Sequence, residues 1–154
     1  MREALEVCRG ELTAKGLQVT VNLEATRPQL TGDPSRLRQV FWNLLQNAAK
    51  FTPEGGAITV RSRDREGGGV AVEVADTGAG ISPELLPKIF DAFERGTSKT
   101  PLGVDGLGLG LAIARNIAQS HGGDLTLDCN GAPTVKFALR LPAAKAAVAL
   151  AAKG

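Results

Sequence analysis

The sequence predicts an α/β fold, a two-layer α/β sandwich in which helices pack on a mixed, mostly antiparallel sheet. Segments with the helical spacing of apolar residues alternate with segments in which every second residue is apolar. Two of the latter, at 57–65 and 70–76, are joined by a glycine-rich turn that is typical of a β-hairpin. The regular strand–helix–strand repetition of a doubly wound parallel sheet is missing from this pattern.

The composition is that of one globular domain and argues against several functional classes. The chain has 154 residues, of which 43% are hydrophobic and 22% are charged. A net charge of +2 is too small to indicate nucleic acid, and an aromatic content of 4% argues against a stacking surface for single strands. Because no apolar run is long enough to span a membrane and no signal-peptide pattern is present, we expect a cytoplasmic location without membrane contact. Cys8 and Cys129 lack metal-ligand spacing and indicate reduced thiols, with a disulfide as the less favoured alternative.

The first half of the chain predicts two helices with a strand between them. Residues 2–14 carry a thin apolar stripe and are expected to be a linker helix that arrives from an upstream helical domain. Gly16 ends this helix, and residues 17–23 alternate as a half-buried strand. The strongest helical pattern follows at 33–52.

The second half predicts the hairpin, two shorter helices and two further strands. A Ser-Pro-Glu sequence predicts a helix at 82–90, and residues 94–105 form a polar loop with the length of a lid. The remaining elements are a helix at 111–120 and strands at 125–129 and 134–141. We therefore divide the chain into a linker helix at 1–14, a catalytic or binding domain at 15–142, and an alanine-rich tail or linker at 143–154.

The second predicted helix carries an unusual polar row. Asp33 can cap its first turn, and Asn43, Asn47 and Lys50 follow at spacings that place all three on one face. Amide oxygens can bind a hard cation such as Mg²⁺, and an ammonium group can bind phosphate. A solvated polar face is the alternative that this helix alone leaves open.

Two glycine clusters point to a flat, phosphorylated ligand. GLGLG at 106–110 precedes a helix, where glycines let backbone N–H groups approach an anion, although it matches neither a Walker A loop nor a Rossmann fingerprint. DTGAGI at 76–81 follows an apolar strand. The carboxylate of Asp76 can accept from an exocyclic amino group such as adenine N6, and Gly78 and Gly80 allow a tight turn beside a ring. An ordinary Asp-Thr-Gly turn is the alternative.

The order of these motifs resembles the ATP-binding domain of sensor histidine kinases, in the GHKL superfamily. The helix with its Asn-x-x-x-Asn-x-x-Lys row corresponds to the N box, and DTGAGI to the first glycine box. Phe90–Phe93 corresponds to the F box, and GLGLGLAI to the second glycine box. The resemblance covers roughly residues 15–142. It implies an α/β sandwich with three main helices that binds ATP and Mg²⁺ beneath a flexible lid.

The resemblance also implies roles for individual residues. Asn47 would bind Mg²⁺ with Asn43 nearby, Lys50 would contact a phosphate, and Arg95 would reach the γ-phosphate; Asn43, Lys50 and Arg95 are the expected catalytic residues. The nucleotide would be bound by Asp76, Thr77, Gly78, Gly80, Ile81, Gly106, Leu107, Gly108, Leu109, Gly110, Leu111 and Thr134, together with Asn47, Lys50 and Arg95.

Some of these roles are more specific than others. Thr77 would hold an ordered water, and Leu109 would lie near the base. Phe90 and Phe93 would be packing residues at the root of the lid. Residues 131–133 depart from the Gly-x-Gly that the family has before the threonine at 134.

One position favours phosphoryl transfer over hydrolysis. Hydrolysing members of the superfamily carry a glutamate as general base where this chain has Asn43, and a carboxamide cannot take a proton near neutral pH. His121, followed by two glycines, indicates a helix end without a catalytic role. We therefore expect a protein histidine kinase catalytic domain that cannot autophosphorylate without an acceptor domain.

The resemblance also implies the partners. They are a histidine-containing dimerisation or phosphotransfer domain and a response regulator, with the fragment monomeric and the full kinase a homodimer. An anti-sigma-type serine kinase and a non-catalytic nucleotide-binding regulator of the same superfamily are the alternatives.

Overall fold

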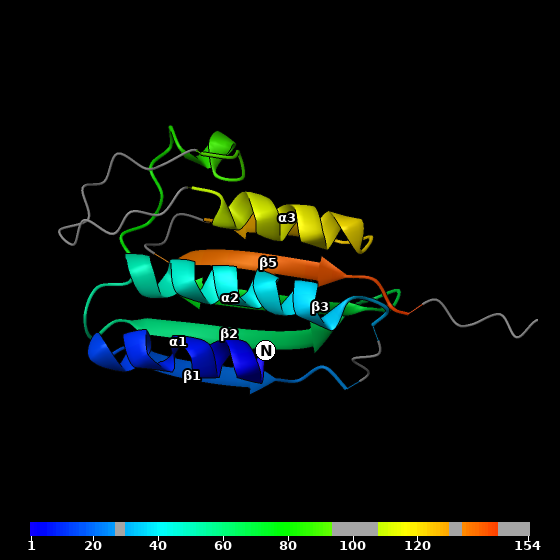
Figure 1. Cartoon of the computed structure of the whole chain (residues 1–154), viewed down its shortest axis with the longest axis horizontal. Coiled ribbons are helices and arrows are strands. Elements are labelled where there is room, and N and C mark those ends of the chain that lie inside the picture. Colours follow the sequence, from blue (N-terminus) through cyan, green and yellow to red (C-terminus); the bar gives the residue numbers. More distant parts are fainter. Residues whose placement is uncertain (27–29, 94–107, 130–133, 145–154) are drawn as a thin grey trace, which may run out of the picture.

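The structure is a computed structural model that describes residues 1–26, 30–93, 108–129 and 134–144. Within them, three α-helices lie on one face of a five-stranded sheet (Figure 1). The elements are α1 (Arg2–Ala14), β1 (Gln18–Leu23), α2 (Pro34–Phe51), β2 (Ala57–Asp64), β3 (Val70–Asp76), the 3₁₀ turn η1 (Leu86–Lys88), α3 (Gly110–Ser120), β4 (Asp124–Asp128) and β5 (Val135–Leu141). The predicted two-layer α/β sandwich with three main helices is confirmed.

The sheet is mixed, with strand order β1-β2-β3-β5-β4. β1 and β2 are parallel because α2 carries the chain back across the sheet between them, and the other three pairs are antiparallel. β3 is therefore the central strand. Its last residue, Asp76, pairs with Val135 at the start of β5.

α2 is the central helix of the helical layer, with α1 on one side and α3 on the other (Figure 1). The predicted cap is present, because the Asp33 side chain accepts hydrogen bonds from the N–H groups of Ser35 and Arg36 at 2.8 and 3.3 Å. The apolar face of α2 is buried in the core. It consists of Val40, Leu44, Leu45, Ala48 and Ala49. Each large side chain of this face contributes about 1.5–3 kcal/mol by leaving water.

α1 is a helix as predicted, and it packs into the domain core. Ala4, Cys8 and Leu12 are buried in the same cluster as the apolar face of α2. Its expected role as the joint to an upstream helical domain stays a prediction. Within the part of the chain that the structure describes, no helix has both the length and the apolar character needed to cross a membrane.

The predicted helix at 82–90 is wrong. This segment holds only the 3₁₀ turn η1, and its backbone hydrogen bonds run mostly between residues three apart, as from Lys88 N–H to the Leu85 carbonyl at 2.9 Å. Pro87 has no N–H to offer to the carbonyl of Pro83, so the hydrogen bond that an α-helix needs at this point cannot form.

Candidate functional site

Asn43 joins the middle of α2 to the first residue of α3. Its side chain is 8% exposed, and its Nδ2 atom donates a hydrogen bond of 3.0 Å to the carbonyl oxygen of Gly110. This bond occupies the amide nitrogen and so assigns the other end of the carboxamide as the oxygen, the atom that a hard cation binds. Asn47 and Lys50 lie half-buried one and two turns further along α2. The predicted polar row is therefore one face of the central helix.

The donor set of this row fits Mg²⁺ that is held mainly by a nucleotide. Among the described residues, no group of three or more His, Cys, Asp or Glu side chains could hold a metal ion. Mg²⁺ in nucleotide sites usually takes only one or two protein oxygens and completes its shell with phosphate oxygens and water. The amide oxygens of Asn43 and Asn47 are suited to such a site.

The N-terminus of α3 is suited to bind an anion. Leu109 is its N-cap residue and supplies no capping side chain, so the first N–H groups of α3 receive no acceptor from the cap. The positive end of the helix dipole adds to the attraction for an anion. Gly108 has a φ of +69°, a conformation that glycine adopts without steric cost. The predicted nucleotide-binding residues Gly108, Leu109 and Gly110 thus lie at this helix end.

Asp76 is a buried carboxylate with an incomplete set of hydrogen bonds. Its residue is 3% exposed, and the N–H of Gly78 donates to Oδ1 at 2.8 Å. That N–H is the one hydrogen-bond donor to this carboxylate among the described residues, so Oδ2 has none from them. Burial raises the pKa of Asp76 above its ordinary value of 3.8, and the hydrogen bond from Gly78 opposes the increase. Among the described residues no fully buried side-chain nitrogen or oxygen atom lacks a hydrogen-bond partner, so Oδ2 keeps some access to the surface. A carboxylate oxygen in this position is a strong acceptor for an amino group of a ligand.

Gly78 lies where the first glycine box touches the end of α2. A Cβ atom at this position would come within 2.6 Å of Asp76 Oδ1 and 2.8 Å of the Phe51 carbonyl oxygen. Glycine is therefore required for this close approach of the backbone to Asp76 and Phe51, whereas its expected place beside a ligand ring stays a prediction. The contact brings Phe51, which directly follows Lys50, against the segment that holds Asp76.

Two threonines predicted near the base lie beside Asp76 in the structure. Thr77 is exposed, and its hydroxyl oxygen accepts a hydrogen bond of 3.0 Å from the N–H of Ala57. Thr134 directly precedes Val135, the residue that pairs with Asp76 across the sheet. The roles of both threonines toward a nucleotide stay predictions.

The remaining predicted binding residues divide into two groups. Ile81 and Leu111 pack partly against the core, and Gly80 has a φ of +81°, which favours glycine. Arg95, Gly106 and Leu107 lie outside the described residues, and so does the predicted lid at 94–105.

Of the two F-box phenylalanines, one is a packing residue and the other is not. Phe90 lies edge-on to Phe137 with ring centroids 6.2 Å apart, and the Arg115 guanidinium lies 4.7 Å from its ring centre. Phe93 is 70% exposed, so the expectation that it packs is wrong. Its N–H donates to the Gly108 carbonyl at 3.1 Å, and its φ of +67° is unusual for a residue with a side chain.

Sequence reasoning missed two residues that position α2. Lys15 donates to carbonyl oxygens at the C-terminal end of this helix. His121 connects the N-terminal end of α2 to the C-terminal end of α3. Its Nε2 accepts from the N–H of Asp33 at 3.0 Å, and its Nδ1 lies 2.8 Å from the Ile117 carbonyl oxygen. The latter contact supports the prediction that His121 has a structural place at the end of α3. Both residues are far from α2 in the sequence, so no local pattern could reveal these contacts.

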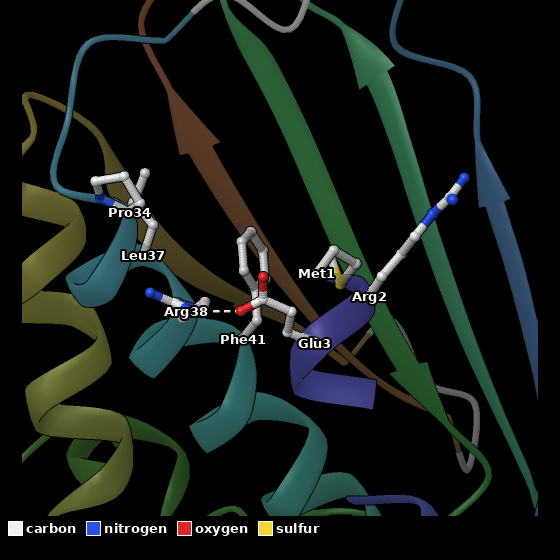
Figure 2. A pocket seen from close by; sticks show the side chains of 7 residues that line it. All are labelled: Met1, Arg2, Glu3, Pro34, Leu37, Arg38 and Phe41. Atoms are coloured by element: carbon white, nitrogen blue, oxygen red, sulfur yellow. Dashed lines mark hydrogen bonds and ion pairs between the residues drawn. The ribbon is translucent and has the colours of Figure 1, made fainter. Parts of the chain in front are cut away.

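A groove of about 420 Å³ lies on the side of α2 that faces α1, away from the side that contacts α3 (Figure 2). Leu37, Arg38 and Phe41 line it from α2, and Arg38 pairs there with Glu3 of α1. Asn43 instead contacts α3. The groove is therefore separate from the contact between Asn43 and Gly110.

The central helix of this sandwich carries a row of carboxamides, and its central strand ends in a buried aspartate. Together these features form the framework of a nucleotide-binding domain. Residues 32–145 match the family described as histidine kinase-, DNA gyrase B-, and HSP90-like ATPase, and the chain belongs to this family. The family fold implies ATP binding.

Relatives and solved structures narrow the family assignment to the catalytic domain of sensor histidine kinases. The chain is 41% identical over 133 residues to the aerobic respiration control sensor protein ArcB of Escherichia coli K12, a match that covers 84% of this chain and 17% of ArcB. It is 34% identical over 143 residues to the adaptive-response sensory kinase SasA of Trichormus variabilis, which covers 91% of this chain and 34% of SasA. The chain thus spans about a third or less of these relatives.

The same class is found among solved structures. The catalytic domain of the histidine kinase ThkA has a TM-score of 0.78 and 30% identity, with 92% of this chain and 90% of that chain covered. ThkA solved in complex with the response regulator protein TrrA has a TM-score of 0.74 and 28% identity, with 93% of this chain and 39% of that chain covered. The resemblance to histidine kinase catalytic domains is confirmed.

Proposed function

We propose that this chain binds Mg-ATP between α2 and α3 and transfers the γ-phosphoryl group to a histidine on a separate domain. The observation that carries the proposal is Asn43. Its amide nitrogen donates to the Gly110 carbonyl, a bond that the carboxylate of a glutamate could not make. A carboxamide also cannot act as the general base that activates water. The position is therefore adapted to hold the two helices together, and hydrolysis has no built-in base there.

Each part of the site has a role in this reaction. Asp76 would accept from the adenine amino group, while the amides of Gly108 and Gly110 would face the phosphates. Asn47, with Asn43, would hold the Mg²⁺ ion, which supplies charge neutralisation when bound. Lys50 would balance the charge of the transferred group, and Arg95 is proposed for the same task.

The chemical step is a displacement at phosphorus. An imidazole nitrogen of the acceptor forms a bond to the γ-phosphorus, the bond from that phosphorus to the β,γ-bridging oxygen breaks, and ADP leaves with the electron pair. Catalysis then consists mainly of positioning and charge stabilisation. The acceptor would be a histidine-containing dimerisation or phosphotransfer domain, and a response regulator would receive the phosphoryl group next. The chain alone would be monomeric, cytoplasmic and unable to autophosphorylate.

The test is transfer of labelled phosphate from [γ-³²P]ATP to a supplied histidine-containing domain. We expect a product that is labile in acid and stable in base, which is the behaviour of phosphohistidine. An acid-stable product would show transfer to serine or threonine and would contradict the proposal, as would release of free phosphate without a labelled acceptor.

Asn47→Ala should abolish both Mg-ATP binding and transfer because it removes the proposed Mg²⁺ ligand. Asn116→Ala, on an exposed position of α3, removes the same side-chain atoms and should change neither. Circular dichroism checks that both variants are folded. Wild-type Mg-ATP affinity in folded Asn47→Ala would refute the assigned role.

A further inference from the structure

α2 ends without the glycine cap that usually completes a helix. Its C-cap residue, Thr52, has an extended conformation with φ −83° and ψ 127°, and Pro53 follows. The common termination in which a left-handed glycine directs the next N–H groups to the last carbonyls is therefore absent from this end. The N–H and the hydroxyl of Thr52 both donate to the Ala48 carbonyl oxygen, which leaves the carbonyl oxygens after Ala48 to find donors elsewhere.

Lys15, at the end of α1, supplies these donors. Its Nζ atom lies 2.6 Å from the Ala49 carbonyl oxygen, 3.1 Å from that of Lys50 and 2.9 Å from that of Thr52. An ammonium group has three N–H donors, so these contacts can use all of them. The backbone of Lys15 takes part as well, because its own carbonyl accepts from the N–H of Gly55 at 3.0 Å.

The helix end that Lys15 holds also forms part of the candidate nucleotide site. One of its three acceptors is the carbonyl of Lys50, whose ammonium belongs to the polar row. The next carbonyl, that of Phe51, lies against Gly78 so closely that a Cβ atom there would be 2.8 Å away. Gly78 in turn donates to Asp76. A continuous set of contacts thus runs from the end of α1 to the buried carboxylate.

We infer that Lys15 is a positioning residue for the nucleotide site, which fixes the distance between the polar row of α2 and the segment that carries Asp76. The inference rests on the proposed function. Lys15 does not need to touch the nucleotide, since it acts through the last turn of α2. The site is then coupled to α1, so a change in how α1 packs on α2 changes the affinity for nucleotide.

The charge of Lys15 supports the same role. The C-terminal end of a helix carries partial negative charge, and at α2 this end lies next to Lys50, where a phosphate is expected. The Lys15 ammonium offsets that charge. A neutral residue at this position would leave the helix end less favourable for an anion as well as less well ordered.

The test compares three variants of the whole chain by titration with Mg-ATP below their unfolding temperatures. Lys15→Met keeps an unbranched side chain that is one atom shorter and removes the charge and the N–H donors. Lys15→Arg keeps the charge and the donors. Leu141→Val is the matched control for lost stability, because Leu141 is buried and pairs with Val70 at the end of the sheet opposite Asp76. The backbone N–H resonance of Gly78 in the nucleotide-free protein reports the position of that segment directly.

We expect Lys15→Met to weaken Mg-ATP binding by about tenfold and to shift the Gly78 resonance, since a residue that acts through a chain of packed contacts typically changes affinity by about 2- to 30-fold. Lys15→Arg should recover most of the affinity, and Leu141→Val should bind like the wild type. A folded Lys15→Met protein with wild-type affinity would overturn the inference, and so would an equal loss in Leu141→Val. If the wild type bound no ATP, the proposed function would fail; an unchanged Gly78 resonance in Lys15→Met would separately show that Lys15 positions nothing.

Discussion

Replacing Asp76 with asparagine should change nucleotide binding and apo stability in opposite directions. The substitution keeps the shape of the side chain and retains an oxygen that can accept from the Gly78 N–H, which donates to Asp76 at 2.8 Å in the wild type. It replaces the second carboxylate oxygen, which has no donor among the described residues, with an amide NH₂ group. The buried negative charge disappears, and the acceptor proposed for adenine becomes a donor.

The binding loss follows from the hydrogen bond that is exchanged. A hydrogen bond to a charged group contributes about 1.5–3 kcal/mol, which corresponds to an affinity loss of about 10- to 150-fold for Mg-ATP. In Asp76→Asn the new side-chain N–H group would face the amino group of adenine, and two donors that face each other repel. We therefore expect an affinity loss in the upper part of this range. Inosine triphosphate carries a carbonyl oxygen where ATP carries the amino group, so Asp76→Asn should bind it better relative to ATP than the wild type does.

The stability effect has the other sign. Burial raises the pKa of Asp76 in the folded protein, so the ionised carboxylate destabilises the fold at every pH above that raised pKa. Asp76→Asn removes this cost, and the apo variant should unfold at an equal or higher urea concentration than the wild type at pH 7. As the pH falls through the raised pKa toward 3.8, the wild type takes up a proton in its folded state and the difference should shrink.

Titration calorimetry with ATP and inosine triphosphate measures the first effect, and urea unfolding at several pH values measures the second. Asp124→Asn is the control of opposite sign, because its hydrogen bond from Arg115 holds the pKa of Asp124 below its ordinary value. That variant should be less stable than the wild type at pH 7, and the stability that Asp124 contributes is lost as the pH falls through its lowered pKa. Equal loss of both nucleotides, or an Asp76→Asn protein that is clearly less stable at pH 7, would refute the reasoning.

Two further predictions concern residues near the ends of α3 and β4. His121→Ala removes the hydrogen bond that connects α3 to the N–H of Asp33, and it should lower the free energy of unfolding by about 1–2 kcal/mol, as measured with urea. Phosphoryl transfer to a supplied acceptor should not change. Loss of that transfer in the folded variant would give His121 a functional role. Cys129 should react with iodoacetamide more slowly than a free thiol at pH 7.5 and faster as the pH rises, because burial first, and then the charges of Asp128 and Asp76, raise its pKa. Mass spectrometry should find Cys8, which is 3% exposed, unmodified under the same conditions, and fast labelling of Cys129 at neutral pH would contradict this environment.

The elements that sequence predicted well are those with strong periodicity and explicit ends. The helix that carries Asn43 has a cap, a proline at its start and a wide apolar face, and the structure has it at Pro34–Phe51. The β2–β3 hairpin follows from alternation around a glycine turn. The segment at 82–90 lacked such redundancy, and there the missing N–H of Pro87 outweighed the apolar spacing.

Spacing along one helix placed Asn43, Asn47 and Lys50 in a row, because helix geometry alone decides which residues share a face. The amino-acid sequence by itself also supplied the chemical character of the site, since carboxamides, a carboxylate and glycines retain their donors and acceptors in any fold. Only the tertiary structure decided that the nitrogen of Asn43 holds the first residue of α3 and that Lys15 completes the end of α2. Those contacts join residues more than thirty positions apart, and packing of whole helices, rather than any local preference, brings them within hydrogen-bond distance.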